Sequence, residues 1–399
     1  MQRITLRQAR GGMILTRGVQ DPRDESTLLE LGQRLTPARL ARLHEAGVYD
    51  LWVEWPGLSA FDGLSAAYSD TEQRVGEALR DGFVSHALAV GVMDAAGLGA
   101  LAADLARPVF QNAVRSTALE QCDGRADTLL RHGAEVAALA LSLLTRLESY
   151  VAQERRWTSS PVAAERAELG LGCLLHDLGE LQVPAERREW RREVLASDEP
   201  DASWRTHAAL GYDLVRGQIG PVAASIVLNH HQHFDGSGFG AGASALAGRR
   251  LHIFWRLATV ADTLLHLRQR DGVPAPMVYG LAQIQRPPVA GWFDPVVCDT
   301  LLQVVLPFVP GMLVELSDGS SALVEHCEAA MPCCPVVRLL GTGVPADQPK
   351  PETLVDLRCD GTRWVTRVDG MDVSDLLYGP MPERHSGSVE LPKELALVG

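Results

Sequence analysis

Three histidines occur within four residues at His230, His231 and His233, and the chain then continues into a glycine-rich turn that ends at Gly240. Neutral imidazole is the commonest metal ligand among side chains, and core packing does not require such a density of histidines. His-rich tracts also occur as solvated loops, so the segment alone is ambiguous. It predicts a metal site only if partner ligands occur elsewhere in the chain.

A first candidate partner is His132, which lies at helical spacing from Leu129, Val136 and Leu139. This spacing places His132 on the apolar face of a helix expected over residues 126–152. A single histidine in such a position is usually a satisfied core residue. His132 therefore needs support from other residues before it counts as a ligand.

Two carboxylates provide that support. Asp177 follows His176 at the end of an apolar helix expected to begin at Ser160–Pro161, and Asp262 lies in the middle of another apolar helix. Burial of an unpaired charge is costly. A metal removes this cost, because an imidazole and a carboxylate can bind one cation while the second carboxylate oxygen reaches another. The pattern indicates that Asp177 bridges two cations.

The remaining candidates also lie on expected helices. His207 follows Thr206 at the start of one helix, where polar residues are common, and His230–His231 end another apolar helix. Each position has an ordinary structural explanation when taken singly. Five histidines and two aspartates with this pattern in one helical region together indicate a shared metal centre.

The composition is that of an ordinary globular protein of two or three domains, with 46% hydrophobic and 22% charged residues over 399 residues. A formal net charge of −13 argues against nucleic acid polymers and anionic membranes as partners. No apolar run is long enough for a signal peptide or a membrane helix. Seven irregularly spaced cysteines fit reduced thiols. We therefore expect a cytoplasmic protein without membrane insertion.

Changes in residue pattern divide the chain into four parts. Thr36–Pro37 is a helix cap and first turn, and Ser317–Ser320 is a turn between two apolar strands. The predicted fold class is mainly α, with β structure at both ends. We expect a small α+β module over residues 1–60, a helical connector over 61–124, a metal-binding helical domain over 125–292, and a β-rich module with a loose tail over 293–399.

The order of the candidate ligands resembles the HD-GYP branch of the HD-domain metal-dependent phosphohydrolases. The resemblance covers roughly residues 125–270, and the flanking regions resemble modules that often accompany this domain. It implies an HD-type helical bundle that holds divalent metals, usually iron or manganese, and hydrolyses cyclic di-GMP to pGpG or GMP. The motifs that carry it are His132, His176–Asp177, His207, His230–His231 with Asp235–Gly238, and Ala261–Asp262.

By position, the resemblance implies a metal cage in which Asp177 bridges the metals and has a catalytic role. Bound cations would neutralise the phosphodiester and lower the pKa of a bridging water, which makes a hydroxide nucleophile near neutral pH. Thr128 stands where three-metal members have a glutamate, so we expect two metal ions. The implied ligands are His132, His176, Asp177, His207, His230, His231 and Asp262.

Several residues that would face the substrate depart from the family pattern. Glu180 replaces a lysine that approaches the phosphate, and Phe239–Gly240 replaces the tyrosine and proline of the family motif. Glu180 either impairs catalysis or turns to solvent. Arg268 either meets a phosphate or is an exposed arginine at a helix end. The substrate contacts expected from the resemblance are Gly236, Ser237, Gly238, Phe239 and Arg268.

The sequence thus favours a metal-dependent phosphodiesterase whose substrate is a cyclic dinucleotide. A second hypothesis is a catalytically silent domain that binds a nucleotide or a signalling protein, with structural metals. A third is an HD-type hydrolase of another phosphorylated substrate. A homodimer and a signalling-protein partner both stay open.

Overall fold

A computed structural model describes residues 2–54 except 7–8, 10, 22–25 and 49, together with residues 128–155, 162–183, 204–240, 246–270, 273–340 and 353–382. The predicted connector and the end of the predicted loose tail lie outside these residues. The chain divides into two compact units, residues 1–307 and 308–399. Within the described ranges, no helix is long and apolar enough to cross a membrane.

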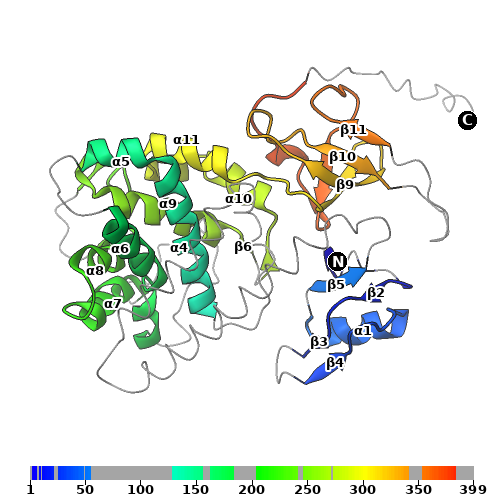
Figure 1. The fold of residues 1–399 in the computed structure, drawn as a ribbon, viewed down its shortest axis with the longest axis horizontal. Helices are drawn as coiled ribbons and strands as arrows, with labels where there is room; N and C mark the ends of the chain where they lie inside the picture. The colour runs from blue at the N-terminus through cyan, green and yellow to red at the C-terminus, as the bar shows by residue number, and fades with distance from the viewer. Residues whose placement is uncertain are drawn as a thin grey trace, which may run out of the picture. The chain divides into compact units, whose positions relative to one another are not determined.

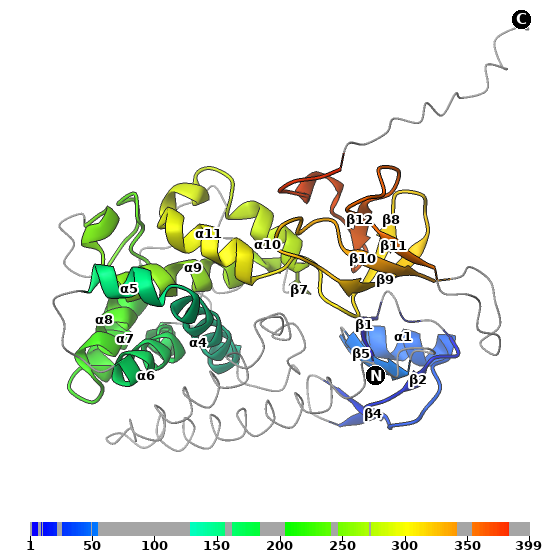
Figure 2. The same ribbon diagram turned by 45° about the horizontal axis from the view of Figure 1, so that its top comes forward.

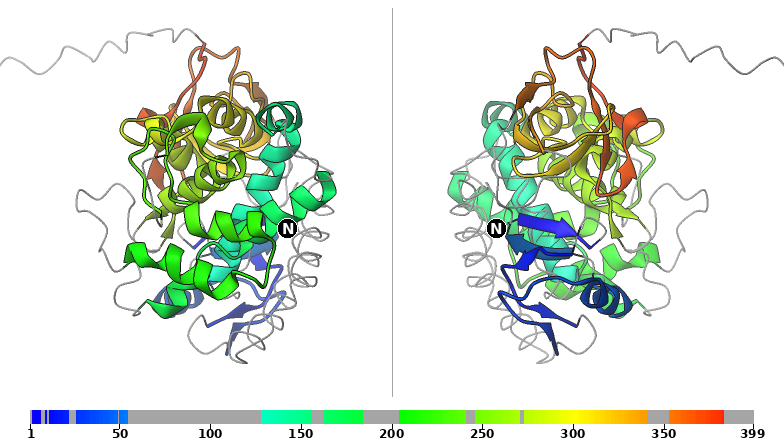
Figure 3. Two further views of the ribbon diagram at one scale, coloured as in Figure 1. Left: turned by 90° about the vertical axis from the view of Figure 1, so that its left-hand side faces the viewer. Right: turned by 90° about the vertical axis from the view of Figure 1, so that its right-hand side faces the viewer.

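The N-terminal residues form a small α+β module, as the sequence predicts. Strand β5 (Asp50–Glu54) lies between β1 (Gln2–Thr5) and β2 (Ile14–Leu15), while β3 (Val19–Gln20) pairs with β4 (Thr27–Leu29). Helix α1 (Pro37–Glu45) begins after Thr36, whose side chain accepts the backbone N–H of Arg39. Figure 3 shows α1 against these strands. The fully buried Leu43 anchors the helix in the core of this module.

The helical region is built from α-helices that pack against one another. Helix α4 packs against α6 and α9, and α6 packs against α8, which places four helices around one core (Figure 1). Helix α11 also packs against α4 and α9. The α-helices of this region are α4 (Thr128–Arg146), α5 (Glu148–Glu154), α6 (Val162–Leu174), α7 (His207–Val215), α8 (Pro221–Asn229), α9 (Ile253–Leu267), α10 (Met277–Gln283) and α11 (Pro295–Val304).

Single-turn 3₁₀ segments connect these helices. Segment η3 (Leu178–Gln182) follows α6 directly, and η5 (Trp204–Thr206) leads into α7. Two others are η6 (Gly248–Arg250) and η7 (Val289–Trp292), and a short hairpin of β6 (Gln269–Arg270) with β7 (Val273–Pro274) follows α9. Segment η3 packs tightly against α7, and this contact brings two chain segments with candidate ligands together.

The second unit contains a six-stranded antiparallel sheet with the order β11-β10-β9-β8-β12-β13 (Figure 2). The predicted hairpin is confirmed, because β8 and β9 pair across a turn at Gly319, which has a φ of 81°. The exact limits of the four predicted parts stay a prediction. The strands are β8 (Leu313–Leu316), β9 (Ser321–His326), β10 (Val336–Leu339), β11 (Leu354–Asp356), β12 (Val365–Val368) and β13 (Met371–Asp372), followed by η8 (Ser374–Leu376).

Candidate metal centre

Five elements bring all seven predicted ligands to one place in the helical region. Their donor atoms form two groups, and within each group the atoms lie within 4.8 Å of one another. The first group is His132 from α4, His176 and Asp177 from the turn between α6 and η3, and Asp262 from α9. The second group is Asp177, His207 from the start of α7, and His230 and His231 from the end of α8.

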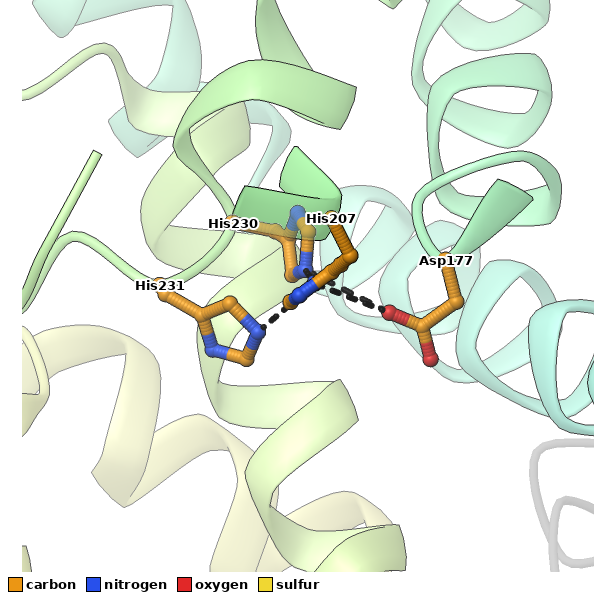
Figure 4. A group of neighbouring side chains, drawn as sticks. All are labelled: Asp177, His207, His230 and His231. Atoms are coloured by element: carbon orange, nitrogen blue, oxygen red, sulfur yellow. Dashed lines mark hydrogen bonds and ion pairs between the residues drawn. The ribbon is translucent and has the colours of Figure 1, made fainter. Parts of the chain in front are cut away.

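Asp177 belongs to both groups and divides its two oxygens between them. Its Oδ1 lies 3.4 Å from His207 Nε2 and 3.5 Å from His230 Nε2 (Figure 4). Its Oδ2 lies 3.2 Å from His176 Nε2 and 3.9 Å from His132 Nε2. A carboxylate in this arrangement can bind one cation with each oxygen.

The imidazoles of the second group converge through the same ring nitrogen. His207 Nε2 lies 3.2 Å from His230 Nε2 and 3.3 Å from His231 Nε2. The other nitrogen of His230, Nδ1, lies 2.9 Å from the carbonyl oxygen of Val227 and donates to it. A hydrogen bond of this kind fixes the tautomer and leaves Nε2 as the basic nitrogen that faces the centre.

The first group shows the same arrangement. His176 Nδ1 lies 2.7 Å from the carbonyl oxygen of Cys173, so His176 Nε2 faces the carboxylates. Asp262 Oδ1 lies 2.9 Å from His132 Nε2 and 3.3 Å from His176 Nε2. Two basic nitrogens and two carboxylate oxygens therefore surround one point.

The chemistry of these donors fits divalent cations. Both carboxylate oxygens of Asp177 and Nε2 of His176 are buried and make no hydrogen bond of acceptable geometry. This holds although His176 Nε2 lies only 3.2 Å from Asp177 Oδ2. Unsatisfied buried polar atoms are costly. Imidazole nitrogens and carboxylate oxygens are ligands of iron, manganese and zinc. Metal ions would satisfy the buried atoms that the protein itself leaves without partners.

Burial controls the protonation of the histidines. It lowers the pKa of His132 and His230, and it lowers that of His231 well below the ordinary value, which favours the neutral form that binds metals. His176 differs, because burial lowers its pKa but the adjacent carboxylate of Asp177 outweighs burial and raises it well above the ordinary value. The same pairing holds the pKa of Asp177 well below its usual range despite burial. A proton on His176 must therefore leave before a metal binds there.

Sequence reasoning missed His266 as part of the centre. It lies one helical turn after Asp262 on α9, is 7% exposed, and places Nδ1 at 2.8 Å from Asp262 Oδ1. Its ring centroid is 4.5 Å from that of His132. The signal was present in the i, i+4 spacing from Asp262, which puts both side chains on one helix face.

The turn after the histidines packs against the centre. A Cβ atom on Gly238 would lie 2.1 Å from the carbonyl oxygen of His231, so only glycine fits there. Ser237 donates its N–H and its hydroxyl to Asp235 Oδ1, at 2.8 and 2.6 Å. His233, the third histidine of the tract, stacks on Trp292 and is in neither donor group.

Phe239 connects the turn to a cation that the sequence analysis did not identify. Its ring stacks on His231 with a centroid distance of 4.6 Å and an interplanar angle of 24°. The guanidinium of Arg205 lies 5.4 Å from the centroid of the Phe239 ring, within the range of a cation–π contact. Nε of Arg205 is buried and has no hydrogen-bond partner among the described residues. Arg205 was missed because Phe239 is distant in sequence.

Two alternatives from the sequence analysis are wrong. Glu180 does not turn to solvent, because it lies in η3 with 0% exposure. Arg268 is not an exposed arginine, because it is 8% exposed and its Nε donates to the carbonyl oxygen of Ala275 at 3.1 Å. The packing of η3 against α7 buries Glu180, and the β6–β7 hairpin folds back over Arg268.

The helical region matches a known family. Residues 125–297 match the family described as HD domain. A solved structure, Bd1817, a HDG"Y"P protein from Bdellovibrio bacteriovorus, is 17% identical, with a TM-score of 0.38 and coverage of 75% of this chain and 97% of that one.

Two curated relatives are similar to parts of this chain. The cyclic di-GMP phosphodiesterase response regulator RpfG of Xanthomonas campestris is 33% identical over 138 residues, which are 32% of this chain and 34% of the relative. The cyclic di-GMP phosphodiesterase PA4108 of Pseudomonas aeruginosa is 24% identical over 243 residues, which are 57% of this chain and 51% of the relative. The chain thus spans a third to a half of the length of these relatives. Residues 125–297 are thus an HD domain.

Proposed function

We propose that this chain is a two-metal phosphodiesterase that hydrolyses a cyclic dinucleotide, with cyclic di-GMP as the leading substrate and pGpG or GMP as product. The observation that carries the proposal is the position of Asp177 between two groups of histidines, with one carboxylate oxygen toward each. Such a bridged pair of sites is suited to phosphate ester hydrolysis. The names of both curated relatives, each called a cyclic di-GMP phosphodiesterase, support the same substrate.

The seven ligands would bind two cations. His132, His176 and Asp262 would hold one cation, His207, His230 and His231 the other, and Asp177 both. Bound cations would neutralise the phosphodiester and lower the pKa of a water molecule that attacks phosphorus. Since His and carboxylate donors suit both metals, iron and manganese are the proposed cofactors. Five of the seven ligands are buried, which would limit the contact of the bound cations with bulk water.

The turn and its neighbour Arg205 would bind the nucleotide. Phe239 presents an aromatic ring beside His231, and Arg205 adds a guanidinium whose buried Nε lacks a hydrogen-bond partner among the described residues. A guanidinium matches the geometry of a phosphate, and an aromatic ring can stack on a base. The proposed substrate contacts are Gly236, Ser237, Gly238, Phe239 and Arg205, with Arg268 as a further candidate from the sequence.

We place the activity in the cytoplasm. The six cysteines that lie among the described residues are all free, which fits a reducing compartment. Four of them, Cys173, Cys327, Cys333 and Cys334, are buried as ordinary small apolar side chains. A signalling role with a partner protein or a second copy is compatible with this placement and stays a proposal.

The test is turnover of cyclic di-GMP by the full chain after anaerobic loading with Fe(II) or Mn(II). We expect linear pGpG or GMP, resolved by chromatography, and no product after Asp177→Asn. Asp213→Asn, on the exposed part of α7, is the matched control and should behave as wild type. Full metal occupancy without turnover of any cyclic dinucleotide would overturn the proposal.

The burial of Glu180 favours a second candidate, a catalytically silent domain that binds the nucleotide without cleaving it. Glu180 occupies the position of the family's phosphate-facing lysine, three residues after the bridging Asp177, and a buried anion there opposes an anionic substrate. Glu180→Gln and Glu180→Lys distinguish the candidates. Hydrolysis that rises in Glu180→Gln indicates an impaired enzyme, whereas tight nucleotide binding without hydrolysis in all three proteins indicates the silent domain.

A further inference from the structure

His266 is a buried histidine beside the metal centre that belongs to neither donor group. It is 7% exposed, and its nearest polar contact is between Nδ1 and Asp262 Oδ1, at 2.8 Å. The same oxygen faces Nε2 of His132 at 2.9 Å and Nε2 of His176 at 3.3 Å. Asp262 Oδ1 therefore contacts two proposed metal ligands from other helical segments, His132 and His176, and also His266 from its own helix.

The geometry defines which atom of His266 carries a proton. A carboxylate oxygen only accepts hydrogen bonds when ionised. Burial raises the pKa of Asp262, but the three neighbouring histidines outweigh burial and hold that pKa well below its usual range. Nδ1 of His266 must then be the donor in the 2.8 Å contact. A charge-assisted hydrogen bond of this length is among the stronger ones in proteins.

Helix geometry makes the contact rigid. His266 follows Asp262 by four residues on α9, so the two side chains lie one above the other on the same face. Both lie in a stretch of α9 whose side chains are buried from Leu257 to Leu267. The ring of His266 also packs at 4.5 Å from that of His132, with an interplanar angle of 60°.

We propose that His266 is a positioning residue that holds the carboxylate of Asp262 toward the cation bound by His132, His176, Asp177 and Asp262. This extends the proposed function, since it assumes that the two donor groups bind metals. Outer hydrogen-bond partners of metal ligands typically change metal affinity by 10- to 100-fold. His266 would thus set the affinity of this group, with much less effect on the group of His207, His230 and His231.

The test is a direct titration of the metal-free full chain with Mn(II), followed by electron paramagnetic resonance and by elemental analysis after gel filtration. In His266→Leu, the site that contains Asp262 should lose about 10- to 100-fold in affinity, whereas the other site should lose much less. His266→Asn should retain affinity within a few-fold, because its amide N–H can replace Nδ1–H as donor. The Asn variant thereby separates donation to Asp262 from metal ligation by His266 itself.

A control variant tests whether a loss of stability in α9 alone lowers the affinity for metal. Leu267→Ala creates a cavity at the neighbouring buried position and should lower thermal stability while both Mn(II) affinities stay at the wild-type value. The proposal is overturned if His266→Asn loses as much affinity as His266→Leu, if His266→Leu binds both ions as wild type does, or if Leu267→Ala loses the same affinity. The titration contains no nucleotide, so a wild-type protein that binds two ions but cleaves nothing contradicts only the proposed function.

Discussion

The ring of Phe239 lies against the imidazole of His231, with centroids 4.6 Å apart and ring planes 24° apart. A residue of the turn therefore contacts a proposed metal ligand directly. The turn and the cage are one structural unit, since Gly238 also packs against the backbone of His231. Changes in the turn should affect nucleotide binding while the donor groups stay intact.

Phe239→Leu should weaken binding of a cyclic dinucleotide by about 10-fold, because a lost aromatic contact costs about 1–3 kcal/mol per stacked base. Phe239→Tyr keeps the ring and should bind like wild type. Calorimetric titration of the metal-loaded proteins measures both affinities. Equal affinity in wild type and Phe239→Leu would remove Phe239 from the binding surface.

Asp177→Asn and Asp262→Asn should differ in metal content. Asp177 faces both donor groups, whereas Asp262 belongs to one. We expect Asp177→Asn to lose both bound ions and Asp262→Asn to lose one, as measured by elemental analysis of protein purified without air. Circular dichroism serves as the folding control. Loss of a single ion in Asp177→Asn would contradict the bridging position.

Gly179→Ala should disrupt the contact between η3 and α7. A Cβ atom at this position would lie 1.9 Å from the carbonyl oxygen of His207 and 2.5 Å from the backbone nitrogen of Gly211. Backbone atoms on both sides cannot move freely, so we expect a loss of about 1–3 kcal/mol in the free energy of unfolding, together with weaker metal binding. Gly11→Ala, where the nearest side-chain atom is 3.7 Å away, is the control and should be neutral. Urea unfolding measures the difference.

Arg256→Met should be among the most destabilising substitutions far from the metal centre. Arg256 is 4% exposed, donates to Asp294 Oδ2 at 2.7 Å, and also pairs with Glu154. Removal of one partner from a buried ion pair costs about 3–5 kcal/mol, because Asp294 is left buried without its cation. Arg216→Met breaks an exposed pair with Asp213 and should cost less than about 1 kcal/mol. A similar loss in the free energy of unfolding of both variants would contradict the larger contribution expected from the buried ion pair.

His252→Asn should reduce the dependence of stability on pH. Nδ1 of His252 accepts the backbone N–H of Phe254 and caps α9, and burial, aided by Arg155 and Arg256, lowers the pKa of His252 to about 4. Between pH 6.5 and 4 the unfolded chain binds a proton that the folded chain does not, so stability falls as the pH falls through this range.

Asparagine keeps the capping acceptor and does not titrate. Relative to the variant, wild type should therefore lose about 1 kcal/mol in the free energy of unfolding between pH 7 and pH 5, a value reduced to allow for partial exposure. Urea unfolding of both proteins at each pH measures it. If the free energy of unfolding changes with pH by the same amount in both proteins, His252 is not the titrating group.

The sequence predicted the helices of the centre well because the ligands lie within, or next to the ends of, strong apolar helical patterns. His132 on α4 and Asp262 on α9 stand out as polar residues on faces that would otherwise be apolar. The hairpin of β8 and β9 was predictable for a similar reason, since a glycine turn joins two apolar strands.

Long-range contacts were beyond sequence reasoning. The pairing of Val314 with Val368 in β8 and β12 joins segments separated by three strands, and no local pattern encodes it. The contact of Arg205 with Phe239 likewise joins residues that are distant in the sequence. Glu180 was hard to place because its burial results from the packing of η3 on α7, which no local pattern encodes.

The shared carboxylate of Asp177 has a thermodynamic consequence. An ion bound in one donor group fixes the carboxylate and removes the charge on its side, so the free energy of binding in the second group depends on whether the first is filled. Such coupling is reciprocal, and equal in both directions. The fraction of fully loaded protein should therefore follow metal concentration more steeply, or less steeply, than two independent sites would. The concentration of available metal in the cell would thus control what fraction of the domain carries both ions.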